Sequence, residues 1–153
     1  MTNNDILRRI RYTLDMGDDQ VIEVFAQGDL EVTREQVCNW LKREEDPDYR
    51  KLKDPVFAAF LNGLINARRG KKEGAPRPVE QQLDNNAILM KLKIAFNLQA
   101  QELQAIMKSG GLSLSKHELS AFFRKAGHKH HRELKDQGLR SFLKGIQKTY
   151  RGA

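Results

Sequence analysis

A histidine-rich tract is the stretch of this sequence that most resembles a metal site. It reads Gly127-His128-Lys129-His130-His131. Imidazole nitrogens suit Zn, Ni and Cu, so His128 and His130 could bind one ion from an irregular loop. However, the interleaved lysine and arginine oppose a cation, and neither a nearby cysteine nor a fixed fourth ligand is visible. The tract is therefore better interpreted as a solvated basic loop, and we expect no metal and no cofactor.

The remaining reactive side chains do not form a recognisable catalytic group. Cys38 lies beside Trp40 in an expected helix, which is typical of a small packed thiol rather than a nucleophile. Asp18-Asp19 stand at an expected helix start, where negative charge complements the helix dipole. No phosphate-binding glycine loop, nucleophile elbow or His-Glu-x-x-His helix occurs. We therefore expect a protein that is not an enzyme, since an unrecognised active site would need a deep polar pocket.

Positive charge gathers late in the sequence. Arg140, Lys144 and Lys148 recur at i, i+4 and i+8 of an expected helix, with Arg151 close behind. Steps of about 6 Å along a helix could reach successive phosphates. The candidate residues for binding nucleic acid or another polyanion are Lys116, Arg124, Lys125, Lys129, Arg132, Arg140, Lys144, Lys148 and Arg151.

Three interpretations of these basic residues stay open. They could form a solvated face whose late cations complement a helix dipole. They could attract nucleic acid or another polyanion, with binding that salt weakens. They could also dock an acidic protein, and the chain itself carries the acidic run Glu44-Glu45-Asp46-Pro47-Asp48. Part of the positive charge could then be met by that run, with His128 and His130 facing Asp46 and Asp48, or by another copy of the chain.

A DNA-reading helix-turn-helix is one special case of the nucleic-acid interpretation. Its second helix would present Lys116, His117, Ser120, Arg124 and Lys125. The connection between the two helices is longer than the three to four residues of the DNA-binding motif. Trp40, Phe122 and Phe123 lie on apolar faces, so we expect them in the core rather than stacked on bases. Most helix pairs with short connections are packing units, and we favour that interpretation here.

The elements that position these residues come from an internal duplication. A shift of 82 residues aligns 3–70 with 85–152 without a gap and produces fifteen identical pairs. These include Asn3/Asn85, Asn4/Asn86, Gly28/Gly110, Arg50/Arg132, Phe60/Phe142 and Gly63/Gly145. Residues 71–84 have the glycine, proline and polar composition of a linker. The sequence therefore predicts two homologous units joined by that linker.

Each unit shows the periodicity of four helices. Apolar residues follow a 3.6-residue period, as in Ile6, Leu7, Ile10 and Leu14 of the first expected helix. We expect Asn4 and Asn86 to cap the first helix of each unit. Gly28 and Gly110 mark the end of the second.

The third and fourth helices carry clear start signals. Thr33 to Gln36 and Ser115 to Glu118 fit the capping box, in which a hydroxyl precedes Glu or Gln by three residues. The fourth helices begin at Asp54 and Asp136, with Pro55 expected at the first helical position. Gly63 and Gly145 interrupt these helices at about 1 kcal/mol each relative to alanine, so we expect a close helix crossing there.

The duplicated motifs resemble the YehS-like family of uncharacterised bacterial proteins, which carry two tandem copies of a domain of unknown function. The motifs are Asn-Asn-x-Ile-Leu opening each copy, Trp40-Leu41-Lys42-Arg43-Glu44 before Asp46-Pro47, and Phe60-Leu61-x-Gly63 with its second copy. The resemblance covers nearly the whole chain. It implies the duplicated helical fold, and the family has no established activity to carry over.

The charge divides unequally between the two units. The chain of 153 residues has a net charge of +7. The first unit, 3–70, has a net charge of −2 from 11 basic and 13 acidic residues, whereas 85–152 has +9 from 13 and 4. The linker 71–84 is neutral. One cysteine favours a reducing compartment, and no apolar run approaches the roughly 20 residues of a membrane-spanning helix. The N-terminus lacks the pattern of a signal peptide, so we expect a cytoplasmic protein without membrane contact.

Together these patterns predict an all-α fold of eight helices. The helices form two tandem, pseudo-symmetric four-helix units that pack into one body. The predicted function is binding, in which the basic second unit contacts nucleic acid or another polyanion. The alternative is a protein–protein adaptor or a self-associating structural protein. The sequence does not indicate an oligomeric state.

Overall fold

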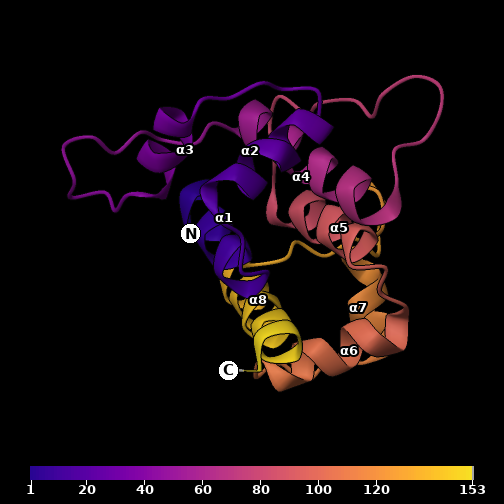
Figure 1. Cartoon of the computed structure of the whole chain (residues 1–153). Coiled ribbons are helices and arrows are strands. Elements are labelled where there is room, and N and C mark those ends of the chain that lie inside the picture. The colour runs from indigo at the N-terminus through magenta and orange to yellow at the C-terminus, as the bar shows by residue number, and fades with distance from the viewer. Residues whose placement is uncertain (153) are drawn as a thin grey trace. The chain divides into compact units, whose positions relative to one another are not determined.

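The computed structural model describes residues 1–152, and that range contains helices and no strand. The first four helices are α1 (Asn3–Thr13), α2 (Asp18–Gln27), α3 (Arg34–Leu41) and α4 (Asp54–Arg69). The next four are α5 (Asn85–Ala95), α6 (Ala100–Ser109), α7 (Lys116–Ala121) and α8 (Asp136–Arg151) (Figure 1). The expected all-α class, with four helices in each copy, is confirmed.

The chain divides into two compact units, unit 1 (Met1–Leu83) and unit 2 (Asp84–Ala153). The segment after α4 is held against unit 1 by hydrogen bonds. Asn62 Nδ2 donates to the carbonyl oxygen of Pro78 at 3.2 Å, and the Leu83 N–H donates to Asp54 Oδ2 at 2.9 Å. Residues 71–83 therefore belong to unit 1, although most of them are exposed.

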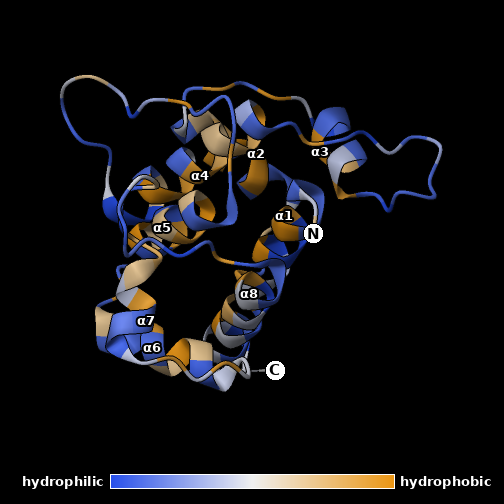
Figure 2. Cartoon of the chain, turned by 180° about the vertical axis from the view of Figure 1, so that it is seen from behind, coloured by the Kyte–Doolittle hydropathy of each residue, from blue (hydrophilic) through white to orange (hydrophobic). Residues whose placement is uncertain are grey.

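Apolar faces of the helices form a core in each unit. In unit 1 the rings of Phe25, Phe57 and Phe60 are fully buried, and the Phe25 and Phe60 centroids lie 5.1 Å apart. In unit 2 Phe142 and Leu103 are equally buried. The ribbons in Figure 2 change from blue to orange around the helices, as expected for amphipathic helices that bury one face.

Glycines allow a close helix crossing at the same place in both units. A Cβ on Gly63 of α4 would lie 1.8 Å from the Val24 carbonyl oxygen of α2, and one on Gly28 would lie 2.0 Å from Ala59 O. In unit 2 a Cβ on Gly145 would lie 2.0 Å from Ile106 O. The expected close crossing is confirmed. Gly28 has an ordinary φ of −93°, so contact with the facing helix requires a glycine there.

The predicted caps of α1 and α5 are wrong. Thr2 caps α1, because the Asp5 N–H donates to Thr2 Oγ1 at 3.1 Å. Asp84 caps α5, because the Ala87 N–H donates to Asp84 Oδ1 at 2.8 Å. Asn4 and Asn86 lie inside their helices, and their side chains bind distant backbone instead. Sequence spacing indicates a possible cap, but it does not show that the asparagine side chain forms hydrogen bonds with backbone groups far away in the sequence.

The start signals of the later helices are confirmed. The Gln36 N–H donates to Thr33 Oγ1 and the Glu118 N–H to Ser115 Oγ, both at 3.1 Å, in complete capping boxes. Helix α4 begins at Asp54 as predicted, although Pro55 occupies its second position rather than its first.

Candidate nucleic-acid interface

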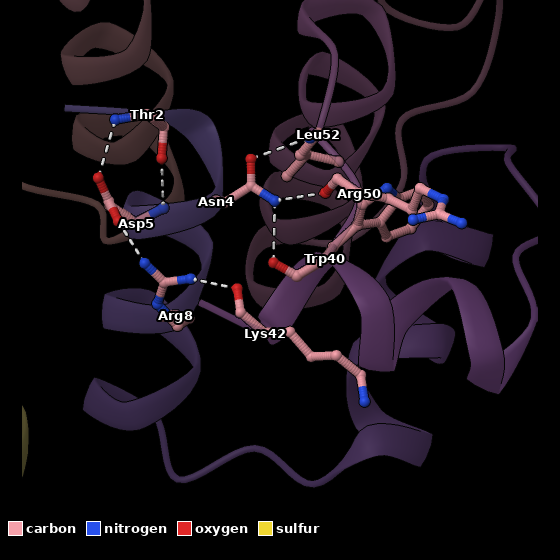
Figure 3. Close-up of polar contacts among 8 residues, drawn as sticks. All are labelled: Thr2, Asn4, Asp5, Arg8, Trp40, Lys42, Arg50 and Leu52. Carbon is pink, nitrogen blue, oxygen red and sulfur yellow. Dashed lines mark hydrogen bonds and ion pairs between the residues drawn. The ribbon is translucent and has the colours of Figure 1, made fainter. Parts of the chain in front are cut away.

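A buried asparagine closes the loop between α3 and α4 in unit 1 (Figure 3). Asn4 Nδ2 donates to the carbonyl oxygens of Trp40 at 2.9 Å and Arg50 at 2.8 Å, and the Leu52 N–H donates to Asn4 Oδ1 at 2.9 Å. The Asn4 side chain is fully buried. One amide therefore fixes both ends of the loop 42–51 to α1, and we call this set of three hydrogen bonds a clasp.

The same clasp recurs in unit 2 and holds the loop that carries most of the histidines. Asn86 Nδ2 donates to the carbonyl oxygens of Phe122 at 3.0 Å and Arg132 at 2.8 Å. The Leu134 N–H donates to Asn86 Oδ1 at 2.8 Å. The repeated asparagines were visible in the sequence as identical pairs, but their role in positioning the loops was missed. Their repetition together with the Arg50/Arg132 pair was the available signal.

Unit 1 has a further side-chain contact that holds the same loop, which we call the Arg8 brace and which is also drawn in Figure 3. Arg8 forms an ion pair with Asp5, and its Nη1 donates to the Lys42 carbonyl oxygen at 2.9 Å. Burial alone would raise the pKa of Asp5, but hydrogen bonds from Thr2 and the charge of Arg8 lower it below its usual value. Position 90, the equivalent of Arg8, is methionine, so unit 2 has no such brace.

The nine predicted basic residues all lie at the surface, but they form two groups rather than one surface patch. The α8 stripe consists of Arg140, Lys144, Lys148 and Arg151. The loop patch consists of Lys116, Arg124, Lys125, Lys129 and Arg132. Helices α7 and α8 each pack mainly against α6. Both views of unit 2 show α7 and α8 apart, with α6 crossing at the bottom from the lower end of α8 towards α7 (Figures 1 and 2).

Arg132 and Lys148, two of the basic residues, hold parts of unit 2 together. Arg132 forms an ion pair with Glu118 at 3.6 Å and lies over the Phe122 ring at 6.0 Å. Lys148 Nζ donates to the Ser109 carbonyl oxygen at 3.0 Å, where it completes the C-terminal end of α6. In unit 1 the equivalent Asn66 makes the equivalent bond to Gln27 O at 2.8 Å. These two cations therefore have a structural role in the fold, apart from any role in binding.

Five of the basic side chains are less engaged. Within unit 2, as far as residue 152, no side-chain hydrogen bond or ion pair involves Lys116, Arg124, Lys125, Lys129 or Lys144. Hydrogen bonding to the carboxylate, including the bond that Asn85 donates, lowers the pKa of Asp136, and the positive charge of Arg140 lowers it further. The cations most available to a ligand are thus Lys116, Arg124, Lys125 and Lys129 of the loop patch and Lys144 of the α8 stripe.

The outer face of the fourth helix differs sharply between the units. In unit 1 this face is buried, with Ala58 at 0% and Asn62 at 3% exposure. The segment after α4 lies over part of it, with a pocket of about 320 Å³ between Pro76 and Val79 on one side and α4 on the other. The same positions in unit 2 are Arg140 and Lys144, and both are exposed. One face of the fold is therefore covered in unit 1 but open and basic in unit 2.

The helix-turn-helix interpretation fails in unit 2 because its candidate recognition helix is too short. Helix α7 ends at Ala121, and six residues extend about 9 Å. Arg124 and Lys125 lie beyond that end, so they do not share a helix with Lys116. Phe122 is buried at 6% exposure, which agrees with its expected place in the core.

The histidine tract does not assemble a metal site. His128 Nδ1 accepts a hydrogen bond from the His130 N–H at 3.0 Å, so that lone pair is already used. The two rings lie 5.5 Å apart between centroids. Among residues 1–152, no group of three or more His, Cys, Asp and Glu side chains could hold an ion.

We therefore expect zinc to leave the histidine tract unchanged. Titration with micromolar Zn²⁺ should produce no shift of the His128 and His130 ring resonances in NMR spectra, because two exposed imidazoles without further ligands bind zinc weakly. Saturable shifts of both rings at micromolar zinc would contradict this expectation.

Over the described range, none of the helices combines the length and the apolar character required to span a bilayer.

Comparison with known proteins agrees with the internal duplication. The family described as "Protein of unknown function (DUF1456)" matches residues 3–70 and again residues 85–152. The uncharacterized protein YehS of Escherichia coli (strain K12) is 40% identical over 147 residues, which cover 95% of this chain and 94% of that protein. No solved structure matches the chain.

Proposed function

The chain belongs to the DUF1456 family of proteins of unknown function. We propose that unit 2 binds nucleic acid through the α8 stripe. The observation that carries this proposal is the contrast on the outer face of the fourth helix. Ala58 and Asn62 are buried on that face of unit 1, whereas Arg140 and Lys144 are exposed on the same face of unit 2. The proposed activity is binding, without a chemical step.

The geometry of the stripe suits a phosphate backbone. Arg140, Lys144 and Lys148 are four residues apart on one helix, so their attachment points rise about 6 Å per step. Because α8 is packed against α6, the cations project from a rigid element. Like charges at this spacing cost a helix about 0.2–0.5 kcal/mol per pair, and a bound polyanion would remove that repulsion. The single cysteine supports placing this binding in the reducing cytoplasm.

The first test removes Arg140 and Lys144, the two cations of the stripe whose equivalent positions are buried in unit 1. We expect R140A/K144A to weaken binding of a fluorescent, mixed-sequence single-stranded oligonucleotide. The slope of log affinity against log salt should fall by about 0.7 for each phosphate that the variant no longer neutralises. Fluorescence anisotropy between about 50 and 200 mM salt measures this slope. Lys148 stays in place because its removal would also expose Ser109 O.

The matched control is K51A/K72A, which removes the same charge from exposed positions of unit 1. If the control weakens binding as much as R140A/K144A, the affinity reflects net charge and not the α8 stripe. If the wild-type protein does not bind even at about 20 mM salt, where screening is weak, the proposal fails. The alternative, an acidic protein partner, would instead appear as one partner that wild-type protein captures from nuclease-treated extract and R140A/K144A does not.

A further inference from the structure

The two clasped loops occupy the same place in their units but carry opposite charge at their tips. The acidic loop of unit 1, residues 43–49, has one basic residue, Arg43, and four acidic residues, Glu44, Glu45, Asp46 and Asp48. The basic loop of unit 2, residues 124–131, has no carboxylate and carries Arg124, Lys125 and Lys129 together with three histidines. Both loops are largely exposed. Duplication has therefore produced two similarly held surfaces of opposite sign in one chain.

The carboxylates of the acidic loop have no cationic partner in unit 1. The nearby Arg50 donates instead to the carbonyl oxygens of Pro47 at 3.5 Å and Tyr49 at 2.9 Å. Asp46 Oδ1 accepts the Asp48 N–H at 2.9 Å, which shapes the turn without neutralising either charge. Burial raises the pKa of the Tyr49 hydroxyl, and the negative charge of Glu44 raises it further. The loop thus keeps a concentrated negative charge.

The cations of the basic loop are equally unpaired within unit 2. The neighbouring carboxylates already have partners, because Glu118 pairs with Arg132 at 3.6 Å and Glu133 with Lys135 at 3.2 Å. Lys125 and Lys129 therefore have no carboxylate to bind in their own unit. An acidic surface outside unit 2 would supply carboxylates for these two lysines.

The clasps make both loops suitable for docking. Asn4 and Asn86 each hold three backbone groups at the two ends of a loop. A loop with fixed ends loses less conformational freedom on binding than a free segment, so more of the electrostatic attraction appears as affinity.

We propose that the basic loop of one chain binds the acidic loop of a second copy. Because each chain carries one loop of each sign, a twofold axis relating the two chains would repeat the contact, so that the dimer would contain it twice. Forming one contact brings the second pair of loops together at high effective concentration, which strengthens a dimer built from individually weak exposed ion pairs. This inference rests on residues outside the α8 stripe and does not depend on nucleic-acid binding.

The experiment measures self-association after charge reversal of either loop. Sedimentation equilibrium of nuclease-treated protein at about 50 mM salt should show a monomer–dimer equilibrium that shifts to monomer at about 500 mM, where charges are strongly screened. We expect E44K/E45K and K125E/K129E each to weaken dimerisation at least about tenfold, since like charges then meet at both contacts. The control E31K/E73K changes net charge as E44K/E45K does, but at exposed positions outside the loop.

A mixture of the two loop variants supplies the decisive arm. One variant carries two basic loops and the other two acidic loops, so each repels itself while the pair is complementary. We expect the equimolar mixture to recover dimer. A monomeric wild-type protein at all concentrations in low salt would overturn the proposal. So would dimerisation that persists in both variants, or a mixture that stays monomeric. Dimerisation weakened equally by E31K/E73K would show a general charge effect and also overturn it.

Discussion

Replacing Asn4 with alanine is expected to lower the free energy of unfolding by about 4 kcal/mol, because three backbone groups lose their partner and each buried unsatisfied group costs about 1–3 kcal/mol. These groups are the carbonyl oxygens of Trp40 and Arg50 and the N–H of Leu52. Water cannot readily replace the amide, since the Asn4 side chain is fully buried. Urea denaturation measures the loss, and the single tryptophan, Trp40, reports directly on the clasp.

The neighbouring Asn3 provides a matched control for this prediction. Asn3 Nδ2 donates to Leu52 O at 3.1 Å and to Asp54 Oδ1 at 2.7 Å, but its side chain is partly exposed and water can take its place. We expect Asn3→Ala to cost about 1 kcal/mol, the usual net value of hydrogen bonds of this kind. Equal losses for the two variants would show that the clasp contributes no more than an ordinary helix contact.

The helical architecture could be predicted because its signals are local. Hydrophobic period, capping boxes and the glycines of the crossing all lie within a few residues of the element that they define. The role of Asn4 could not be predicted in this way, because its partners lie 36 to 48 residues away. The same local view assigned Asn4 to a cap, although Thr2 was available two residues earlier.

The candidate site was predictable residue by residue but not as a surface. Composition and spacing identified the basic residues, and all nine lie at the surface. Which of these residues face the same way depends on how α7 and α8 pack around α6. Local patterns in a single sequence do not reveal that packing. Lys148 illustrates a second limit. Its bond to Ser109 O becomes intelligible only when Asn66 is seen to make the same bond in unit 1.

A second large effect is expected where helix propensity and packing disagree. Gly63 lies inside α4, where alanine would normally stabilise a helix by about 1 kcal/mol. However, an added Cβ would lie 1.8 Å from the Val24 carbonyl oxygen and 2.9 Å from the Gly28 nitrogen, and both atoms belong to backbone that cannot turn aside. We therefore expect Gly63→Ala to destabilise the protein by about 3 kcal/mol, near the upper end of the cost of overpacking.

Three further variants separate the effect of the helix crossing from that of helix propensity. Ala67→Gly, at an exposed position of the same helix, should cost about 0.5–1 kcal/mol and measures the propensity term alone. Gly28→Ala should be about as damaging as Gly63→Ala, because its Cβ would lie 2.0 Å from Ala59 O. The double variant G28A/G63A should then lose clearly less than the sum of the two, since one outward shift of α2 from α4 relieves both clashes. Urea denaturation followed by Trp40 fluorescence measures all four variants, and strict additivity would mean that the glycines do not act through one shared crossing.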